Sequence, residues 1–429
     1  MPLHRSSVGG LIGPDAFMWS AGIEDTFIAE PWPQTGRILD EYELTGHYRR
    51  WREDIGLMAE LGIHVARYGI PWYRVNPAKG KWHWDWADRA LERLLELGIE
   101  PIVDLVHYGT PAWIEGGFLA ADFSERMAEY AGRLAERFKG RIHAYTPLNE
   151  PRITAWYCGK LGWWPPCRRG WRGFVAVMLG ICLGIVRTIE ALHAVDENIL
   201  PVHVDATDLY ETSNPALNPE VERRQEIVFL ALDLISGRVV KEHPLHDWLL
   251  RQGATLKDLE WFQEHAIELA LIGINLYPMY SRKVLVKSAR GLRIQMPYAS
   301  GEIIDRLGEM YWERYRCPLL ITETAAVGSV QRRQDWLDAS VAAVKRVRER
   351  GIPLVGYTWW PMLAIVTWAY RQGTLSPAQY LKQLGLWDLD ARPEADLERL
   401  RTPLVDAYRE LVAKGSETVG KLKEQHVVS

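Results

Sequence analysis

The sequence predicts a single (β/α)8 barrel that spans residues 1–414. Two observations support this fold class: short apolar runs alternate with amphipathic helical segments along nearly the whole chain, and glycines close several of those segments before the next run begins. Alternating units of this kind favour a parallel sheet, and eight of them without a second domain close most economically into a barrel. A doubly wound sheet is the alternative, but the Gly-rich phosphate turn expected after its first strand is missing.

The order of the elements follows from hydrophobic periodicity and from turn residues. Strands are expected at 16–21, 64–69, 101–106, 143–148, 199–204, 271–275, 317–324 and 353–359. Helical segments are expected at 41–61, 85–97, 123–138, 174–195, 219–265, 334–350 and 397–413. Residues 415–429 form a polar tail, which we expect to be flexible because chain termini often are.

Composition excludes several classes of protein. The chain has 429 residues, 48% hydrophobic content and a formal net charge of −4, so it can bury a large core and has no bulk electrostatic reason to bind nucleic acid or an anionic membrane. The N-terminal sequence lacks a secretory signal and a long apolar segment, so we expect a cytoplasmic enzyme. The sequence does not indicate an oligomeric state.

The cysteines argue against a disulfide framework or a zinc site. Cys158, Cys167, Cys182 and Cys317 lack CxxC spacing, although Cys158 and Cys167 could meet within one loop. Tryptophan, in contrast, is abundant, with 20 residues. We expect about half of these rings to pack in the core and others to offer flat apolar faces to a sugar.

Two predicted strands end in a glutamate. The run before Pro151 stops at Glu150, because proline lacks a backbone donor, and the run 317–324 carries Glu323 near its end. Retaining glycosidases use two carboxyl groups roughly 5 Å apart, and a barrel brings such acids together at one rim. The alternative for Glu150 is a surface ion pair with Arg152.

Further candidates follow other strands. They are Glu24 or Asp25, Arg67, His107, Tyr108, Asn149, Asn275, Tyr277, Trp359 and Trp360. Arg67 beside Glu323 would favour the ionised nucleophile, which the hydroxyl of Tyr277 would also contact. Glu150 in a dry aromatic wall would retain its proton and act as the acid. Asn149 would bind the 2-hydroxyl of the sugar.

Structural roles compete with these assignments. Arg67 could be a buried ion-pair partner, His107 a core histidine, and Tyr108, Trp360 and Trp368 simple packing residues. His203 and Asp205 point the same way from one strand and resemble a pair of metal ligands. They lack an HExxH motif or a third ligand, so a hydrogen-bonding or core role is favoured, and we expect no metal or cofactor.

The motifs resemble those of glycoside hydrolase family 1, the retaining β-glycosidases with acids on the fourth and seventh barrel strands. TPLNEP at 146–151 is similar to the acid/base motif of that family, and LLITET at 319–324 is similar to its nucleophile motif. The resemblance extends over nearly the whole chain, including 47–72 and 272–277. It implies that Glu150 is the acid/base, that Glu323 is the nucleophile, and that the supporting residues are Arg67, His107, Tyr108, Asn149, Asn275 and Tyr277.

Several positions depart from the family pattern. Glu24 stands where the family usually has a Gln that binds the 3- and 4-hydroxyls, and Thr367 replaces a Glu that binds the 4- and 6-hydroxyls. Trp360 and Trp368 keep their spacing, and Thr324-Ala325 stands where the family usually continues with Asn-Gly. Each unsatisfied hydroxyl costs about 1 to 3 kcal/mol, so these changes predict altered glycone recognition. Glu24 hints at a basic or differently hydroxylated glycone.

The sequence therefore predicts a cofactor-independent retaining β-glycosidase that acts on a carbohydrate or glycoside through a covalent intermediate on Glu323. One alternative is a β-transglycosylase with an alcohol or sugar acceptor, for which Trp163, Trp164 and Trp171 would form a platform. The other is a barrel that binds a saccharide without cleaving it, although two acids that repel each other when ionised have little reason to persist there.

Overall fold

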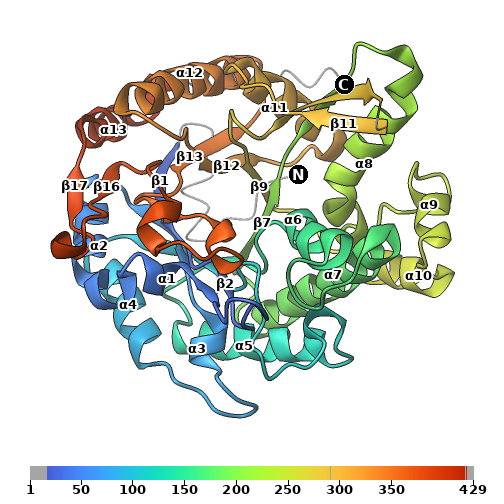
Figure 1. Ribbon diagram of the computed structural model, residues 1–429, viewed down its shortest axis with the longest axis horizontal. Coiled ribbons are helices and arrows are strands. Elements are labelled where there is room, and N and C mark those ends of the chain that lie inside the picture. The colour runs from blue at the N-terminus through green and yellow to red at the C-terminus, as the bar shows by residue number, and fades with distance from the viewer. Residues whose placement is uncertain (1–16, 290, 421, 423–429) are drawn as a thin grey trace.

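Eight parallel strands form a closed barrel in the computed structural model, which describes residues 17–289, 291–420 and 422 (Figure 1). Around the barrel the order is β1-β13-β12-β9-β7-β6-β5-β4, and β1 closes the ring by pairing with both β13 and β4. The strands are β1 (Met18–Ile23), β4 (Val65–Gly69), β5 (Glu100–Asp104), β6 (Ala144–Thr146), β7 (Leu200–Ala206), β9 (Leu271–Asn275), β12 (Leu319–Thr324) and β13 (Leu354–Trp359). The prediction of a (β/α)8 barrel is confirmed.

The expected strands are all present, with shifted boundaries. The sixth expected strand coincides with β9, whereas β1 begins two residues later than expected, and residue 16 lies outside the described residues. β6 ends at Thr146 rather than at 148, because Pro147 has no backbone N–H for the ladder. Asn149 rejoins the sheet through an isolated parallel bridge to Val204.

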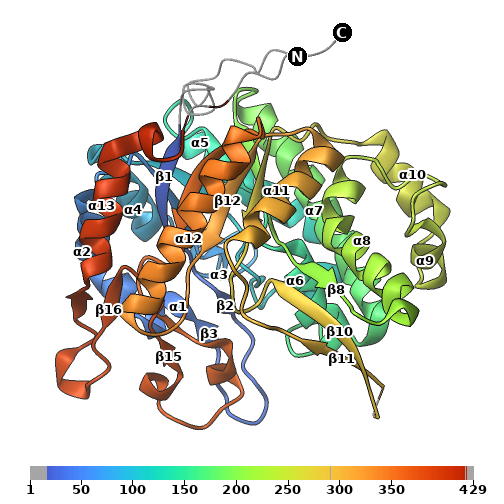
Figure 2. The ribbon, with the colours of Figure 1, turned by 90° about the horizontal axis from the view of Figure 1, so that it is seen from above.

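Helices surround the barrel in Figures 1 and 2. They are α1 (Glu41–Leu44), α2 (His47–Glu60), α3 (Trp72–Val75), α4 (Asp85–Glu96), α5 (Phe123–Arg137), α6 (Pro151–Ala155), α7 (Gly170–Val195), α8 (Asn218–Ile235), α9 (His246–Arg251), α10 (Leu256–Glu264), α11 (Glu302–Tyr315), α12 (Val330–Glu349) and α13 (Pro403–Lys414). The expected helix 41–61 is broken at Gly46, whose φ of 73° is left-handed. The expected helical section 219–265 contains α8, α9 and α10.

The closing helix is shorter than the sequence predicts. It begins at Pro403, because β17 (Arg399–Arg401) pairs with β16 (Trp387–Leu389) and holds the chain extended before it. Just after α13, the indole N–H of Trp19 donates to the carbonyl of Gly415 at 3.1 Å, and Val419 is buried. Of the predicted flexible tail, residues 421 and 423–429 lie outside the described residues.

Small sheets extend the carboxyl end of the barrel. β2 (Phe27–Ile28) pairs with β3 (Leu39–Asp40), and β14 (Ile365–Val366) pairs with β15 (Leu381–Lys382). β8 (Leu209–Glu211), β10 (Arg282–Ser288) and β11 (Gly291–Gln295) form a third sheet. Figure 2 places β2, β3, β15 and the β10–β11 hairpin at the same end of the molecule. These segments follow strand ends, so they frame the rim where the site residues lie.

Among the described residues, α7 is the one helix long and apolar enough to cross a membrane by length and composition. Most of its apolar stretch is buried inside the protein, where it packs along α5. The burial matches that of a core helix in a large domain.

Candidate active site

One network of contacts connects eleven residues that the sequence singles out. They are Glu24, Arg67, His107, Tyr108, Asn149, Glu150, Asn275, Tyr277, Glu323, Trp360 and Trp368. Arg67 lies within β4, Trp368 comes from the long segment after β13, and the others lie at or just after the ends of barrel strands. The carboxyl ends of parallel strands meet at one rim of a barrel, which explains how residues so far apart in sequence come together.

Arg67 lies at the centre of this network. The strand β4 runs between β1 and β5, so the buried guanidinium reaches carboxylates from both sides of it. Its Nη1 is 2.8 Å from Oε1 of Glu323, its Nη2 is 2.9 Å from Oδ2 of Asp104, and its Nε is 3.1 Å from Oε1 of Glu24. Burial opposes the charge, but the three carboxylates together raise the pKa of Arg67. The arginine therefore supplies one positive charge to three acids.

Glu323 is held by two donors on different elements. Besides Arg67, the hydroxyl of Tyr277 donates to its Oε2 at 2.7 Å. An irregularity in the pairing of β12 with β9 places Glu323 opposite Asn275. Both carboxylate oxygens of Glu323 accept hydrogen bonds, which fixes the orientation of the side chain.

Glu150 occupies a different electrostatic environment. Asn275 donates from Nδ2 to its Oε1 at 2.9 Å, and the hydroxyl of Tyr108 hydrogen-bonds its Oε2. Burial and the nearby charge of Glu323 outweigh these donors and raise the pKa of Glu150 to about 8. Its side chain is therefore mostly protonated at neutral pH.

The alternative ion pair between Glu150 and Arg152 is not formed. Arg152 instead lies 3.0 Å from Asp208 and donates to the carbonyl of Ala206.

Glu150 has a φ of 47° and Tyr108 a φ of 77°, both in the left-handed region that non-glycine residues rarely adopt. Backbone strain of this kind concentrates at functional sites.

His107 and Asn149 contact protein groups through their polar atoms. Nδ1 of His107 lies 3.0 Å from Oδ2 of Asp104, and its Nε2 lies 3.3 Å from Nδ2 of Asn149. Oδ1 of Asn149 accepts from Arg67 at 3.2 Å and from Asn275 at 3.3 Å. These residues fix the position of the two acids relative to each other.

Sequence reasoning missed Asp104 and Thr322. Asp104 binds both Arg67 and His107, and the hydroxyl of Thr322 donates to Oδ1 of Asn275 at 2.7 Å. The spacing of Asp104 and His107, three residues apart across a strand end, was a signal that could have revealed the first. Thr322 was hidden inside the apolar run that predicts β12.

Aromatic rings line the site. The ring centroid of Trp360 is 6.0 Å from that of His107 and 6.3 Å from that of Tyr277, while its indole N–H donates to Glu24. Trp368 packs edge-on against Tyr108, with ring centroids 5.0 Å apart.

Burial raises the pKa of Glu24, and the nearby charges of Glu323 and Asp104 raise it further. Arg67 opposes this shift without cancelling it.

The expected platform of Trp163, Trp164 and Trp171 is not a single surface. Trp164 is buried between Tyr157 and Trp368, and Trp171 packs on other rings away from them. Trp163 alone of the three is exposed, at 43%.

Cys158 and Cys167, which could have met within one loop, are both free thiols. Cys158 is buried and Cys167 is exposed.

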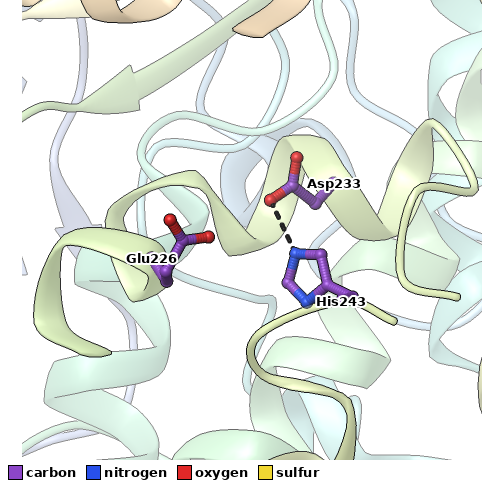
Figure 3. Close-up of side chains that lie close together, drawn as sticks. All are labelled: Glu226, Asp233 and His243. Carbon is purple, nitrogen blue, oxygen red and sulfur yellow. Dashed lines mark hydrogen bonds and ion pairs between the residues drawn. The ribbon is translucent and has the colours of Figure 1, made fainter. Parts of the chain in front are cut away.

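Two other clusters of titratable side chains lie outside this network. Burial lowers the pKa of His203 to about 4 and raises that of Asp205 to about 7. Among the described residues, the one group of three side chains with metal-binding atoms within 4.8 Å of one another is Glu226, Asp233 and His243 (Figure 3). Arg314 Nη2 lies 2.8 Å from Glu226 and 2.6 Å from Asp233, so a guanidinium already neutralises these acids.

An eight-stranded barrel with two rim glutamates, one buried with a raised pKa and one paired with an arginine, is the arrangement of a glycoside hydrolase. The family model "Glycosyl hydrolase family 1" matches residues 20–227. A bifunctional β-D-glucosidase/β-D-fucosidase of Bifidobacterium breve is 27% identical over 89% of each chain, and thermostable β-glucosidase B of Thermobispora bispora is 27% identical over 85% of each. The matched part of the chain is similar to glycosyl hydrolase family 1, and most of the chain is similar to β-glucosidases.

Solved structures agree on the fold. A β-glucosidase from Thermotoga maritima in complex with glucoimidazole superposes with a TM-score of 0.79 and 21% sequence identity, covering 94% of this chain and 98% of that chain. A family 1 β-glucosidase from the same organism, in complex with isofagomine lactam, gives a TM-score of 0.79 at 20% identity and covers 95% of this chain and 99% of that chain.

Proposed function

We propose that the protein cleaves a β-linked glycoside with retention of configuration, by double displacement through a covalent glycosyl intermediate on Glu323. The observation that carries this proposal is the contrast between the two acids. Glu323 accepts hydrogen bonds from Arg67 and Tyr277, whereas burial raises the pKa of Glu150 to about 8. A carboxyl group whose pKa is raised by burial suits the role of the acid, and one held by an arginine and a tyrosine hydroxyl suits that of the nucleophile.

In the first step, Glu323 attacks the anomeric carbon while Glu150 donates its proton to the departing oxygen. A bond forms between the glutamate oxygen and the anomeric carbon as the glycosidic bond breaks. In the second step, Glu150, now ionised, takes a proton from water, and the resulting hydroxide displaces Glu323. Asn275 and Tyr108 orient Glu150 through both steps.

Recognition of the glycone differs from the usual family pattern in this proposal. Glu24, which contacts Arg67 and Trp360, is a carboxyl group where the family usually has an amide, and Thr367 brings no carboxylate to the site. The sugar hydroxyls that the family usually binds through these two positions therefore need other partners. Loss of those hydrogen bonds changes which sugars the site prefers.

Replacement of Glu323 by Gly tests the proposed nucleophile. The variant should lose turnover of an activated aryl β-glycoside and regain it with azide, which would yield an α-glycosyl azide. Incubation of the parent with a 2-fluoro glycosyl fluoride should add one glycosyl unit to the peptide that contains Glu323, detected by mass spectrometry. A Glu323→Gly variant as active as the parent would refute the proposal, and the absence of any adduct across several sugars would favour a saccharide-binding barrel.

Transglycosylation is a second candidate, supported by the exposed ring of Trp163, which lies against Tyr157 with centroids 5.5 Å apart. Tyr157 also packs against Trp368, and Trp368 packs against Tyr108, which contacts Glu150. Trp163 therefore extends the row of aromatic rings that begins beside Glu150. An acceptor alcohol stacked there would replace water in the second step. The ratio of transfer product to free sugar, measured with and without added acceptor in the parent and in Trp163→Ala, separates transfer from hydrolysis.

A further inference from the structure

A small cavity adjoins the site beside Glu24 and Trp360. Its volume is ≈ 30 Å³, and its lining includes Glu24, Glu41, Trp360 and Trp368. One water-sized group needs about 10–15 Å³ measured in this way, so the cavity accepts one or two such groups and is too small for a sugar ring. It is the right size for a single polar substituent.

Glu41 brings an unsatisfied carboxyl group to this cavity. The residue is 5% exposed, and its Oε2 accepts a hydrogen bond from the backbone N–H of Val366 at 3.1 Å. Its Oε1 is buried and, within the described part of the chain, has no hydrogen-bond partner; Glu41 also has no ion-pair partner there. A buried polar atom without a partner is costly, and a polar ligand group in the cavity would satisfy it.

Trp360 connects the reacting acids with this cavity. Its ring lies near that of Tyr277, whose hydroxyl contacts Glu323, and its N–H donates to Glu24 on the cavity wall. A pyranose stacked on the indole with its anomeric carbon at Glu323 therefore has its opposite edge directed towards Glu24. Carbons C4 and C6 are the positions remote from the anomeric carbon, so their substituents enter the cavity.

The balance of charge selects the kind of substituent. Arg67 is the cation that contacts Glu24, Asp104 and Glu323, and no described cation pairs with Glu41. Burial raises the pKa of Glu41 to about 8, so a positive charge arriving beside it would favour its ionised form. A neutral hydroxyl satisfies one hydrogen bond, whereas an ammonium group satisfies the hydrogen bond and the missing charge together.

We propose that the glycone carries an ammonium group on C4 or C6, and that Glu41, assisted by Glu24, binds it. The inference rests on the proposed glycosidase function and specifies its substrate class as amino sugars with the amine remote from the scissile bond. Glu41 is then a specificity-determining residue.

Competing substrates test the inference. The parent enzyme is assayed at pH 7 with nitrophenyl β-D-glucopyranoside, its 6-amino-6-deoxy and 4-amino-4-deoxy analogues, and the N-acetylated analogue of each amine. We expect kcat/KM for one amine to exceed that for the neutral glucoside and for the acetylated analogue by about tenfold or more. Equal or lower values for both amines would overturn the inference.

Glu41→Gln removes the charge at nearly constant shape. The preference ratio should fall about tenfold, mainly through a higher KM for the amine. Glu43→Gln is the matched control, because Glu43 lies in the same short helix but is exposed and pairs with Arg74. Its ratio should equal that of the parent. An unchanged ratio in Glu41→Gln would assign the preference elsewhere and refute the role of Glu41.

A binding measurement separates failure of the inference from failure of the proposed function. Calorimetric titration compares methyl 6-amino-6-deoxy- and 4-amino-4-deoxy-β-D-glucopyranoside with methyl β-D-glucopyranoside, which requires no turnover. Selective binding of an amine without turnover of any glycoside would retain the inference and reject the glycosidase. Turnover without selective binding would do the reverse.

Discussion

The hydroxyl group of Tyr277 lies 2.7 Å from Oε2 of Glu323 and joins β9 to β12 at the reacting end of the barrel. The other carboxylate oxygen of Glu323 accepts from Arg67. Because the tyrosine comes from the segment just after β9, its hydroxyl holds Glu323 from the side opposite β4. The orientation of Glu323, the proposed nucleophile, therefore depends on a side chain to which the proposed mechanism assigns no proton transfer.

Tyr277→Phe should lower kcat about 10- to 100-fold with a smaller change in KM. A hydrogen bond to a charged group contributes about 1.5 to 3 kcal/mol, and here it acts on the attacking carboxylate. Steady-state kinetics with an activated aryl β-glycoside give both constants. A variant with the parent kcat would remove Tyr277 from the catalytic assembly.

The pH dependence of kcat/KM should show a basic limb near pH 8. Glu150 must be protonated to act as the acid, so activity falls as the pH rises through its pKa of about 8. The hydrogen bond from Tyr108 lowers that pKa, so Tyr108→Phe should move the limb to higher pH. Profiles of both enzymes from about pH 5 to pH 10 check the shift, and movement to lower pH would contradict the assignment.

Arg67→Met should reduce the free energy of unfolding by about 3 to 5 kcal/mol, because it leaves buried carboxylates without their shared cation. Urea denaturation at pH 7 measures the loss. Arg49→Met is the control: Arg49 pairs with Asp396, but both side chains are more than half exposed, so the change should stay within about 1 kcal/mol. Equal losses in the two variants would mean that the buried network contributes little to stability.

Glu41→Gln should make stability less sensitive to rising pH. The buried carboxyl has a pKa raised to about 8, so between its unfolded value and pH 8 the folded state binds more protons than the unfolded state. Stability from this group is therefore complete below the unfolded pKa and is lost as the pH rises towards 8. The slopes of unfolding free energy against pH for parent and variant should differ by up to about 1.4 kcal/mol per pH unit. Identical slopes would exclude a raised pKa at Glu41.

Gly22→Ala should impair glycone binding while leaving the fold intact. A Cβ at Gly22 would lie 2.5 Å from Cδ1 of Trp360 and 2.7 Å from Oε2 of Glu24, so those side chains must move. We expect a higher KM for aryl glycosides and an unchanged far-ultraviolet circular dichroism spectrum. Parental kinetics in this variant would indicate that neither side chain contacts the sugar.

The fold could be predicted because each barrel strand is buried on both faces and appears as an apolar run between turn residues. The sequence pattern assigns no element to the segment that forms α11, and it does not reveal β10, because charged residues interrupt the alternation of that strand. β10 depends on pairing with β8, which lies far away in the sequence, and with β11. Periodicity cannot report pairings of that kind.

The same distinction applies to the candidate site. Glu150 and Glu323 stand out because each ends an apolar run beside a recognisable motif. Glu41 does not, because it begins a short helix and meets the site only when the segment around Val366 folds over it. Asp104 was not identified for a related reason, since its role depends on an arginine from the neighbouring strand.

The three-way sharing of Arg67 also constrains how this enzyme can change. A mutation that alters sugar preference at Glu24 also changes the field felt by Glu323, so selectivity and speed cannot be adjusted separately there. Laboratory evolution towards a new sugar should accumulate compensating substitutions around the arginine before activity recovers. Lineages in which residue 24 changes should therefore also carry changes at residues around Arg67.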